Sequence, residues 1–220
     1  MEVLYSDNSL IVVNKPSGLL TIRDGYNPDL PTVKSVLEVD FGRCWIVHRL
    51  DKETSGVLLV ARTESVHRSL NIDFQNHKIN KLYRAIILGR PERDIFTIDL
   101  PLKINGDRKH RTVVDPNNGK PAKSEVKLLK TNGIISLIEI KIYTGYTHQI
   151  RAHLSAAGFP LIGDRLYGDR KISQEDSFPY KIDRTALHSY QLEFNHPVLN
   201  KQIVFTAEIP PDIRSISDFK

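Results

Sequence analysis

The chain has 220 residues, of which 40% are hydrophobic and 26% are charged, close to the average of globular proteins. No segment approaches the roughly 20 consecutive apolar residues of a membrane-spanning helix, which excludes a protein anchored by such helices. Lysine and arginine number 31 against 26 aspartates and glutamates, and the net charge of +5 is compatible with a polyanionic partner without requiring one. The length fits one large domain, so we expect a single domain over residues 1–220.

The N-terminal sequence and the cysteine content indicate a reducing compartment. The first residues, MEVLYSDNSLIVV, lack the basic start, apolar run and small-residue cleavage site of a secretory signal. The single cysteine, Cys44, excludes an intrachain disulfide and a zinc site built on paired cysteines. We therefore expect a cytoplasmic protein in which Cys44 is an unreactive packing residue.

Apolar residues in the first half occur in short runs that turn sequences interrupt, which is typical of buried strands. These runs cover residues 10–13, 46–47, 57–60 and 82–88. Between them, a helix is expected over residues 63–77, with Thr63 as its N-terminal cap.

Hairpins dominate the second half. Residues 123–129 and 134–142 are joined by Thr-Asn-Gly, a typical tight-turn sequence, and a second hairpin is expected from residues 186–194 and 202–209. A helix with Thr147 as its cap is expected to end at Gly158. Because strands and helices do not alternate, the order favours an α+β fold. We expect a mixed, largely antiparallel central sheet with flanking helices and loops. A bilobed arrangement with a central cleft is compatible with this fold.

Common catalytic motifs are missing from the sequence. It contains no Gly-rich dinucleotide fingerprint, no GxxxxGK phosphate loop, no HExxH and no Gly-x-Ser-x-Gly elbow, so nucleotide, zinc-protease and serine-hydrolase functions lose their usual support. Polar residues instead gather in three strings beside or within apolar elements: HRLDKETSG at 48–56, KLYRA at 81–85 and TGYTHQIRAH at 144–153.

Asp51 is the candidate reactive group of the first string. It follows a short apolar strand and stands between Arg49 and Lys52, which would keep its carboxylate ionised and oriented, as a nucleophile or base requires. The alternative is that Asp51 caps a turn, and from composition alone this is the more common case.

The other two strings also have structural explanations. Tyr83 shares a strand face with Lys81 and Ala85, where a core tyrosine is the ordinary interpretation, and Arg151 on the second helix could be a surface residue. His148 and His153 are poorly spaced for one helical metal site and have no third ligand nearby, so no metal site is expected.

A basic stretch, LKINGDRKHR at 102–111, could follow several phosphates of a nucleic acid or could be a solvated loop. Its cations are Lys103, Arg108, Lys109 and Arg111, against the single Asp107.

Together, NKPSG, VHRLDKETSGVLLVAR, KLYRA, THQIRAHL with GFPLIGDRLYG, and LHSYQLEFNHP resemble the RluA-type pseudouridine synthases in order and spacing, from about Leu10 to Pro211. The resemblance implies the pseudouridine synthase fold and an isomerase that converts uridine to pseudouridine in RNA without a cofactor, metal or nucleotide. It also outweighs the structural explanations for Asp51, Tyr83 and Arg151.

The resemblance further implies residue roles. Asp51 would be the catalytic nucleophile or base, Tyr83 would face the target uracil and assist proton transfer, and Arg151 would pair with Asp51. Arg49 would replace the extruded nucleotide, with His48 beside it on the RNA. Lys103, Arg108, Lys109 and Arg111 would contact the RNA backbone.

Two features depart from many members of the family. Tyr146 stands where an arginine is usual, so a phosphate contact there is in doubt and Tyr146 is free to pack or stack. The chain resembles a short form without an N-terminal S4 domain. Ribosomal RNA, transfer RNA or both remain open as substrates, and a monomer is expected.

The alternatives are a non-catalytic RNA-binding or assembly protein with the same fold, and a hydrolase of glycosidic bonds. The hydrolase would need a second carboxylic acid at a defined separation from the first.

Overall fold

The computed structural model describes residues 1–25, 27–168 and 178–218. The chain divides into two compact units, the first formed by Met1–Lys81 with Ser189–Glu208 and the second by Leu82–His188 with Ile209–Lys220. Two strands, β5 (Asn80–Leu88) and β11 (Leu187–Asn195), contain the boundaries between the units.

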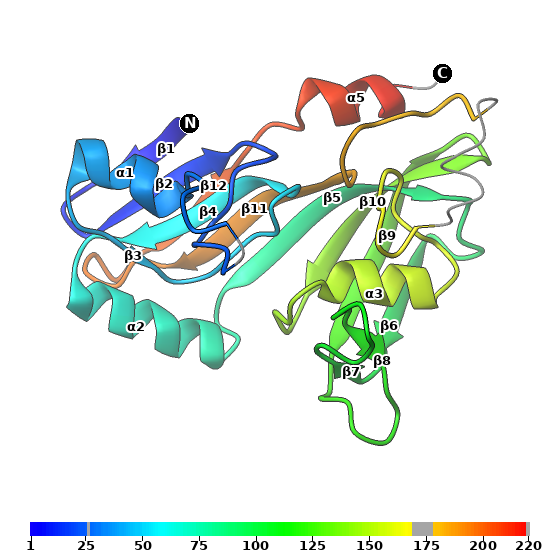
Figure 1. The fold of residues 1–220 in the computed structure, drawn as a ribbon, viewed down its shortest axis with the longest axis horizontal. Helices are drawn as coiled ribbons and strands as arrows, with labels where there is room; N and C mark the ends of the chain where they lie inside the picture. The colour runs from blue at the N-terminus through cyan, green and yellow to red at the C-terminus, as the bar shows by residue number, and fades with distance from the viewer. Residues whose placement is uncertain (26, 169–177, 219–220) are drawn as a thin grey trace. The chain divides into compact units, whose positions relative to one another are not determined.

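The first unit is built on neighbouring strands in the order β1, β2, β4 and β11 (Figure 1). Its strands are β1 (Glu2–Ser6), β2 (Leu10–Lys15), β3 (Trp45–Ile46), β4 (Ser55–Ala61), β11 and β12 (Gln202–Thr206). Strand β2 pairs with β1 and β4, β3 pairs with β4, and β12 pairs with β11, all antiparallel.

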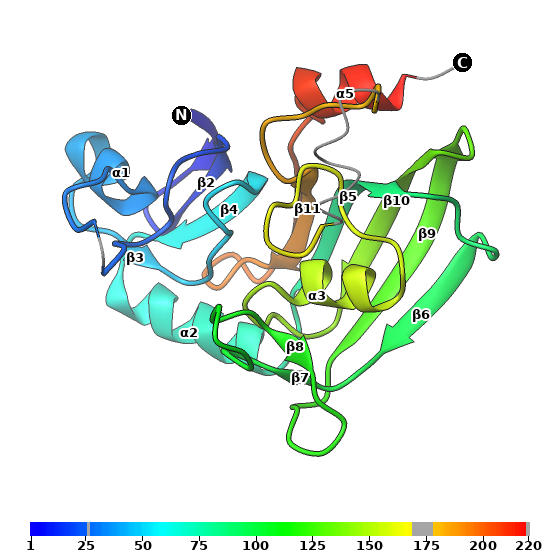
Figure 2. The ribbon, with the colours of Figure 1, turned by 45° about the vertical axis from the view of Figure 1, so that its right-hand side comes forward.

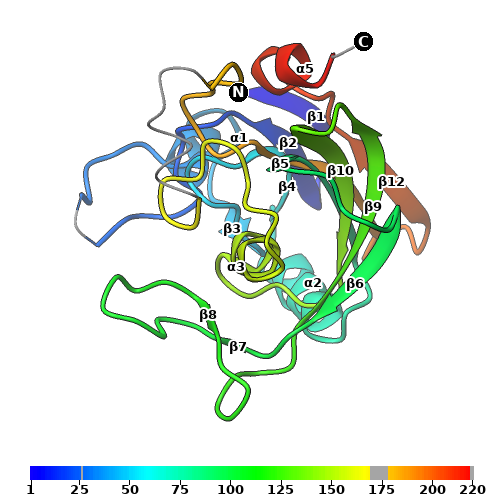
Figure 3. The ribbon, with the colours of Figure 1, turned by 90° about the vertical axis from the view of Figure 1, so that its right-hand side faces the viewer.

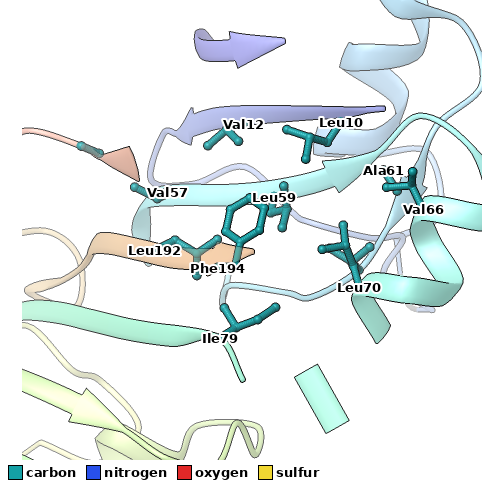
Figure 4. Close-up of a cluster of buried hydrophobic side chains, with 12 residues drawn as sticks. Leu10, Val12, Val57, Leu59, Ala61, Val66, Leu70, Ile79, Leu192 and Phe194 are labelled. Atoms are coloured by element: carbon teal, nitrogen blue, oxygen red, sulfur yellow. The ribbon is translucent and has the colours of Figure 1, made fainter. Parts of the chain in front are cut away.

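Helices α1 (Val33–Phe41) and α2 (Glu64–Gln75) belong to the same unit. Thr63 caps α2 as the sequence predicts, because its hydroxyl accepts a hydrogen bond from the Val66 backbone at 3.3 Å. Val66 and Leu70 of α2 pack on apolar side chains of β2, β4 and β11 (Figure 4). This core holds β3 and β4, the two strands that flank the Asp51 loop.

The second unit is built on β5, β10 (Ile135–Ile142), β9 (Lys123–Thr131) and β6 (Ile95–Asp99), in that order and antiparallel. A small ribbon of β7 (Leu102–Lys103) and β8 (Val113–Val114) carries the basic loop. Helix α3 (Gln149–Ala156) lies against one face of the sheet (Figures 2 and 3), and α5 (Pro211–Ser217) packs Ile213 and Ile216 on Ile86 and Ile135.

The main elements confirm the α+β prediction, including the four apolar strands and both hairpins. Two details differ. In the β9–β10 turn only Gly133 has a positive φ, and Asn132 instead accepts backbone hydrogen bonds through its side-chain oxygen. Helix α3 begins after His148 in the left-handed conformation, with no side-chain cap, so the predicted cap at Thr147 is wrong.

No helix among the described residues is long and apolar enough to cross a membrane. Cys44 is buried, as expected for a packing residue. The single-domain boundary stays a prediction.

Candidate active site

Asp51 lies at the start of a tight turn between β3 and β4. The backbone N–H of Thr54 donates to the Asp51 carbonyl at 3.1 Å, which closes the turn over Lys52 and Glu53. Asp51 is half-buried and Arg49 is exposed, whereas Leu50 between them is 4% exposed. The buried leucine holds the loop, so the two charged side chains stand at a fixed place on it.

The segment Lys15–Thr21 clamps this turn from the other side. Thr21 exchanges hydrogen bonds with Leu50, its hydroxyl donating to the carbonyl at 2.8 Å and accepting from the N–H at 3.2 Å. The Ser17 hydroxyl donates to the Glu53 carbonyl at 2.8 Å. These bonds make the Asp51 loop rigid, because its backbone groups on both sides of Asp51 are bonded to one neighbouring segment.

Lys15 is the buried centre of this clamp. Its side chain is 0% exposed, and its ammonium donates to the carbonyls of Pro16, Leu19 and Lys52 at 3.0, 2.7 and 3.1 Å. The Gly18 N–H donates to the same Lys52 carbonyl at 2.8 Å. No local pattern in NKPSG predicts that Lys15 anchors the Asp51 turn, so sequence reasoning missed this role.

Gly56 lets β4 leave the turn beside β11. Its φ is +111°, and a Cβ at this position would overlap the backbone of Ser189. The Ser189 hydroxyl also donates to the Val57 carbonyl at 3.0 Å. The glycine of TSG is therefore required by the close approach of two backbones.

His48 is turned inward, and its contacts are structural. Its Nε2 accepts a hydrogen bond from the Leu59 N–H at 2.9 Å, and its ring stacks on Phe74 with centroids 4.8 Å apart. Burial, and secondarily the charge of Lys81, lowers the pKa of His48 to about 3. A neutral acceptor fits these contacts, and the expected RNA-binding role stays a prediction.

Lys81 is a second buried cation that sequence reasoning missed. It is 8% exposed, its ammonium lies 5.9 Å from the Phe74 ring centroid, and burial lowers its pKa to about 8. Lys81, Tyr83 and Ala85 are all buried on one face of β5, as the alternation predicts. The sequence signal for a buried lysine here is its alternation with Tyr83 and Ala85 along one face of an apolar strand.

Tyr83 stands in the second unit. It is 7% exposed and lies opposite Ile140 on β10. On the other face of the strand, Arg84 pairs with Glu139 at 2.8 Å. Strand β5 therefore places Tyr83 inside and keeps its neighbouring charge on the opposite face.

Arg151 is oriented by a carboxylate that sequence reasoning did not identify. Its Nε and Nη2 donate to the two oxygens of Asp164 at 2.7 and 2.8 Å, a bidentate pair with Asp164 fully buried. Asp164 also accepts from the N–H groups of Leu166 and Tyr167 at 2.9 and 3.0 Å. The expected pairing of Arg151 with Asp51 joins residues of different units and stays a prediction.

The pKa of Asp164 lies below its ordinary value. Burial alone would raise it, but the hydrogen bonds and charge of Arg151, with the two backbone donors, outweigh that effect. The carboxylate therefore stays ionised and holds the guanidinium in one orientation.

The string TGYTHQ forms the base of α3 through Gln149, which is 2% exposed. Its side-chain oxygen accepts from the Thr144 hydroxyl at 2.8 Å and the Tyr146 N–H at 3.1 Å, and its amide donates to the Lys123 carbonyl at 3.2 Å. Tyr146 packs against an apolar cluster that includes Ala152 of α3. This agrees with the expectation that Tyr146 packs in place of the usual arginine.

The basic loop between β7 and β8 exposes only some of its cations. Lys103, Arg108 and Lys109 are exposed, and Lys103 pairs with Asp115 at 3.6 Å. Arg111 donates to Asp107 at 2.6 Å and to the Leu166 carbonyl at 3.2 Å. Arg111 is therefore engaged within the protein, whereas Arg108 and Lys109 face solvent.

Among the described residues, no group of three or more histidines, cysteines, aspartates and glutamates could hold a metal ion. Of the sequence candidates, His48, Arg49 and Asp51 share one loop of the first unit. Tyr83, Arg151 and the basic loop belong to the second.

Comparisons with known proteins show the family of this chain. The family model of RNA pseudouridylate synthases matches residues 9–156. Ribosomal large subunit pseudouridine synthase D of Zymomonas mobilis is 36% identical, and that of Yersinia pestis 33%, each over 97% of this chain. The chain spans 71% and 68% of these relatives, and 59% of the corresponding protein of Neisseria meningitidis serogroup A, which is 35% identical.

Two solved human structures have a similar fold. RNA Pseudouridylate Synthase Domain Containing 1 is 25% identical, with a TM-score of 0.79 over 98% of this chain and 86% of that one. RNA Pseudouridylate Synthase Domain Containing 4 has a TM-score of 0.80 over 98% and 91%, at 24% identity. The chain therefore belongs to the RNA pseudouridylate synthase family, of the RluA type, whose members isomerise uridine to pseudouridine in RNA.

Proposed function

We propose that this chain isomerises uridines of large-subunit ribosomal RNA, with the carboxylate of Asp51 as its nucleophile or base. The observation that carries the proposal is the clamp on the Asp51 turn, in which Lys15 and Thr21 fix the backbone on both sides of it. A carboxylate on so rigid a loop is preorganised for one position on a substrate. The names of the relatives support ribosomal RNA as the substrate.

The reaction balances without a co-reactant. The bond between N1 of uracil and C1′ of ribose breaks, and its electron pair leaves with the uracil. Asp51 either attacks C1′ to give a sugar ester or removes a proton from the ribose. The uracil then turns and its C5 bonds to C1′, as the sugar ester opens or the ribose proton returns. The C5 proton is lost and N1 takes one up, so the product is an isomer of the substrate.

Arg151 and Tyr83 are proposed to assist Asp51. Arg151 is held at one edge by Asp164, and its guanidinium would pair with the Asp51 carboxylate and orient it. Tyr83, buried on β5, would face the uracil and pass a proton through its hydroxyl. Arg49, exposed beside the turn, would fill the space left by the extruded nucleotide.

The RNA backbone is proposed to lie along the loop between β7 and β8. Arg108 and Lys109 are exposed in this loop, and Lys103 is exposed at its base, where it pairs with Asp115. Arg111 and His48 are weaker candidates for RNA contact, since both have internal hydrogen bonds. Cytoplasmic location and a monomeric state stay predictions.

The proposal predicts that Asp51→Asn loses isomerisation by at least about a thousandfold while its fold and RNA affinity persist. Purified protein is incubated with a ribosomal RNA transcript, and pseudouridine is located by carbodiimide labelling and primer extension. Asp29→Asn, an exposed aspartate of the same unit, is the matched control. Turnover by Asp51→Asn comparable with that of the control would refute the role of Asp51.

Products distinguish the alternatives. Free uracil in the supernatant would indicate a glycosidic hydrolase, and RNA binding without any new base would indicate a non-catalytic protein. Mapping pseudouridine in cells with and without the gene tests the substrate, because loss of a site in transfer RNA alone would contradict the ribosomal assignment.

For Tyr83 we expect Tyr83→Phe to lower kcat by about a hundredfold or more while the Kd for RNA changes less than about threefold. The hydroxyl is needed for proton transfer, whereas the ring that fills the same space is kept. Single-turnover rates and filter binding on the same transcript measure the two quantities. Unchanged kcat in this variant would remove the proton role.

A further inference from the structure

Tyr167 is a prominent residue that the roles proposed above leave unused. It stands in the turn that begins at Asp164, and the Cζ atoms of Arg151 and Arg111 lie 5.0 and 5.9 Å from its ring centroid. Distances within about 6 Å are those at which a guanidinium is attracted by an aromatic ring. Tyr167 therefore contacts both Arg151 and the last cation of the basic loop.

The Tyr167 hydroxyl ties together two further segments. It accepts a hydrogen bond from the Thr112 N–H at 2.8 Å and lies 3.2 Å from Nδ1 of His148. His148 has a φ of 56°, directly before α3, and its ring meets that of Tyr167 edge-on. The hydroxyl thus joins the end of the basic loop to the start of the helix that carries Arg151.

Two other contacts fix the same end of the loop. The Thr112 hydroxyl donates to the Thr147 carbonyl at 2.6 Å, and Arg111 donates to the Leu166 carbonyl at 3.2 Å. The loop is therefore fastened to the two segments that orient Arg151, namely the start of α3 and the turn of Asp164. A single residue, Tyr167, contacts all of them.

We propose that Tyr167 is a positioning residue for the isomerisation, whose ring fixes the face of the Arg151 guanidinium and whose hydroxyl fixes the RNA-contacting loop. Asp164 holds one edge of the guanidinium, and the ring removes the remaining freedom to tilt. This inference rests on the proposed function, because Arg151 and the loop have their catalytic and RNA-binding roles only there.

Two substitutions separate the ring from the hydroxyl. Tyr167→Phe keeps the ring and removes two hydrogen bonds of the hydroxyl, so KM for RNA should rise about five- to tenfold while kcat stays within about twofold. Tyr167→Leu also removes the ring, so kcat should fall about tenfold or more in addition. Tyr146→Phe is the matched control, since Tyr146 packs in the same apolar cluster.

A second measurement does not depend on catalysis. Trypsin cleaves after Arg108 and Lys109, the exposed cations at the tip of the loop. Without RNA, cleavage there should be about fivefold faster in Tyr167→Phe than in the wild-type protein or in Tyr146→Phe, because one end of the loop has lost one of the hydrogen bonds that hold it.

The combined results decide between the possibilities. A rise in KM with faster cleavage in Tyr167→Phe, and a fall in kcat only in Tyr167→Leu, supports the inference. Unchanged cleavage and KM in Tyr167→Phe overturns it, and so does an equal fall of kcat in both variants. If the wild-type protein converts no uridine, the proposed function fails, and the cleavage rates still decide whether Tyr167 holds the loop.

Discussion

The orientation of Arg151 depends on Asp164, whose carboxylate is fully buried. Replacement by asparagine keeps the size and the acceptor for the Leu166 and Tyr167 N–H groups, but it leaves the guanidinium beside a neutral group. Breaking a buried ion pair in this way costs about 3 kcal/mol or more. We expect Asp164→Asn to lower the free energy of unfolding in urea by about that amount.

The control for this variant is Asp107→Asn. Asp107 also pairs with an arginine, Arg111, but the two side chains are 26% and 34% exposed. Solvent-screened pairs contribute little to stability, so this variant should unfold nearly as the wild-type protein does. Equal losses in the two variants would contradict the importance of the buried pair.

The lowered pKa of Asp164 gives the same pair a pH dependence. The folded pKa lies below the ordinary 3.8, so the unfolded chain binds the proton more readily. The stabilisation is therefore complete well above pH 3.8 and is lost as the pH falls through the folded pKa. Below pH 4 the wild-type free energy of unfolding should fall more steeply than that of Asp164→Asn, as urea titrations at pH 5, 4 and 3 would measure.

At the residue scale, the sequence offered candidates for the chemistry but did not show the residues that hold them in place. Asp51, Tyr83 and Arg151 stand in strings that resemble the family motifs, and the roles that this resemblance implies stay predictions. Lys15 bonds to the backbone of Lys52, 37 residues away, and Asp164 bonds to the side chain of Arg151, 13 residues away. No local sequence pattern predicts such pairs.

Strand β4 depends on Gly56, where the chain leaves the Asp51 turn. An alanine there would need both a left-handed φ and room that the Ser189 backbone occupies. We expect Gly56→Ala to lose about 3 kcal/mol or more of folding free energy, or to be insoluble. Gly133→Ala is the control: its φ is +88° but its Cβ meets nothing within 4 Å, so only the strain of about 1–2 kcal/mol applies.

The loop between β7 and β8 should carry part of the salt dependence of RNA binding. The double variant Arg108→Ala, Lys109→Ala should reduce the slope of log K for RNA against log salt concentration by about 1 to 2. Arg93→Ala, an exposed arginine in the β5–β6 connection, is the control and should leave the slope unchanged. Fluorescence anisotropy at several salt concentrations measures it, and an unchanged slope in the double variant would exclude this loop from the RNA interface.

Elements with strong apolar periodicity or turn residues were predictable, and those with atypical ends were not. The four apolar strands and the Thr63 cap followed from pattern. Helix α1 was missed because its capping box uses Ser35 where the usual sequence has an acidic residue or glutamine. The start of α3 was misplaced because the left-handed His148 has no signature in the sequence.

The stability of the whole chain should depend on pH through His48. Its folded pKa of about 3 lies far below the ordinary 6.5, so between these values the unfolded chain binds the extra proton. The contribution is complete above pH 6.5 and is lost as the pH falls toward 3. The expected loss is at most about 1.4 kcal/mol per pH unit.

His48→Gln isolates this contribution, because the glutamine oxygen can accept the Leu59 hydrogen bond without titrating. We expect the variant to match the wild-type protein at pH 7.5 within about 1 kcal/mol and to lose about 2 kcal/mol less between pH 6.5 and 4.5. The only tryptophan, Trp45, lies in the same unit, so its fluorescence in urea follows that unit, and far-ultraviolet circular dichroism follows the whole chain. Parallel pH curves for the two proteins would show that His48 does not stay neutral in the fold. A difference seen by fluorescence alone would show that the first unit unfolds separately from the second.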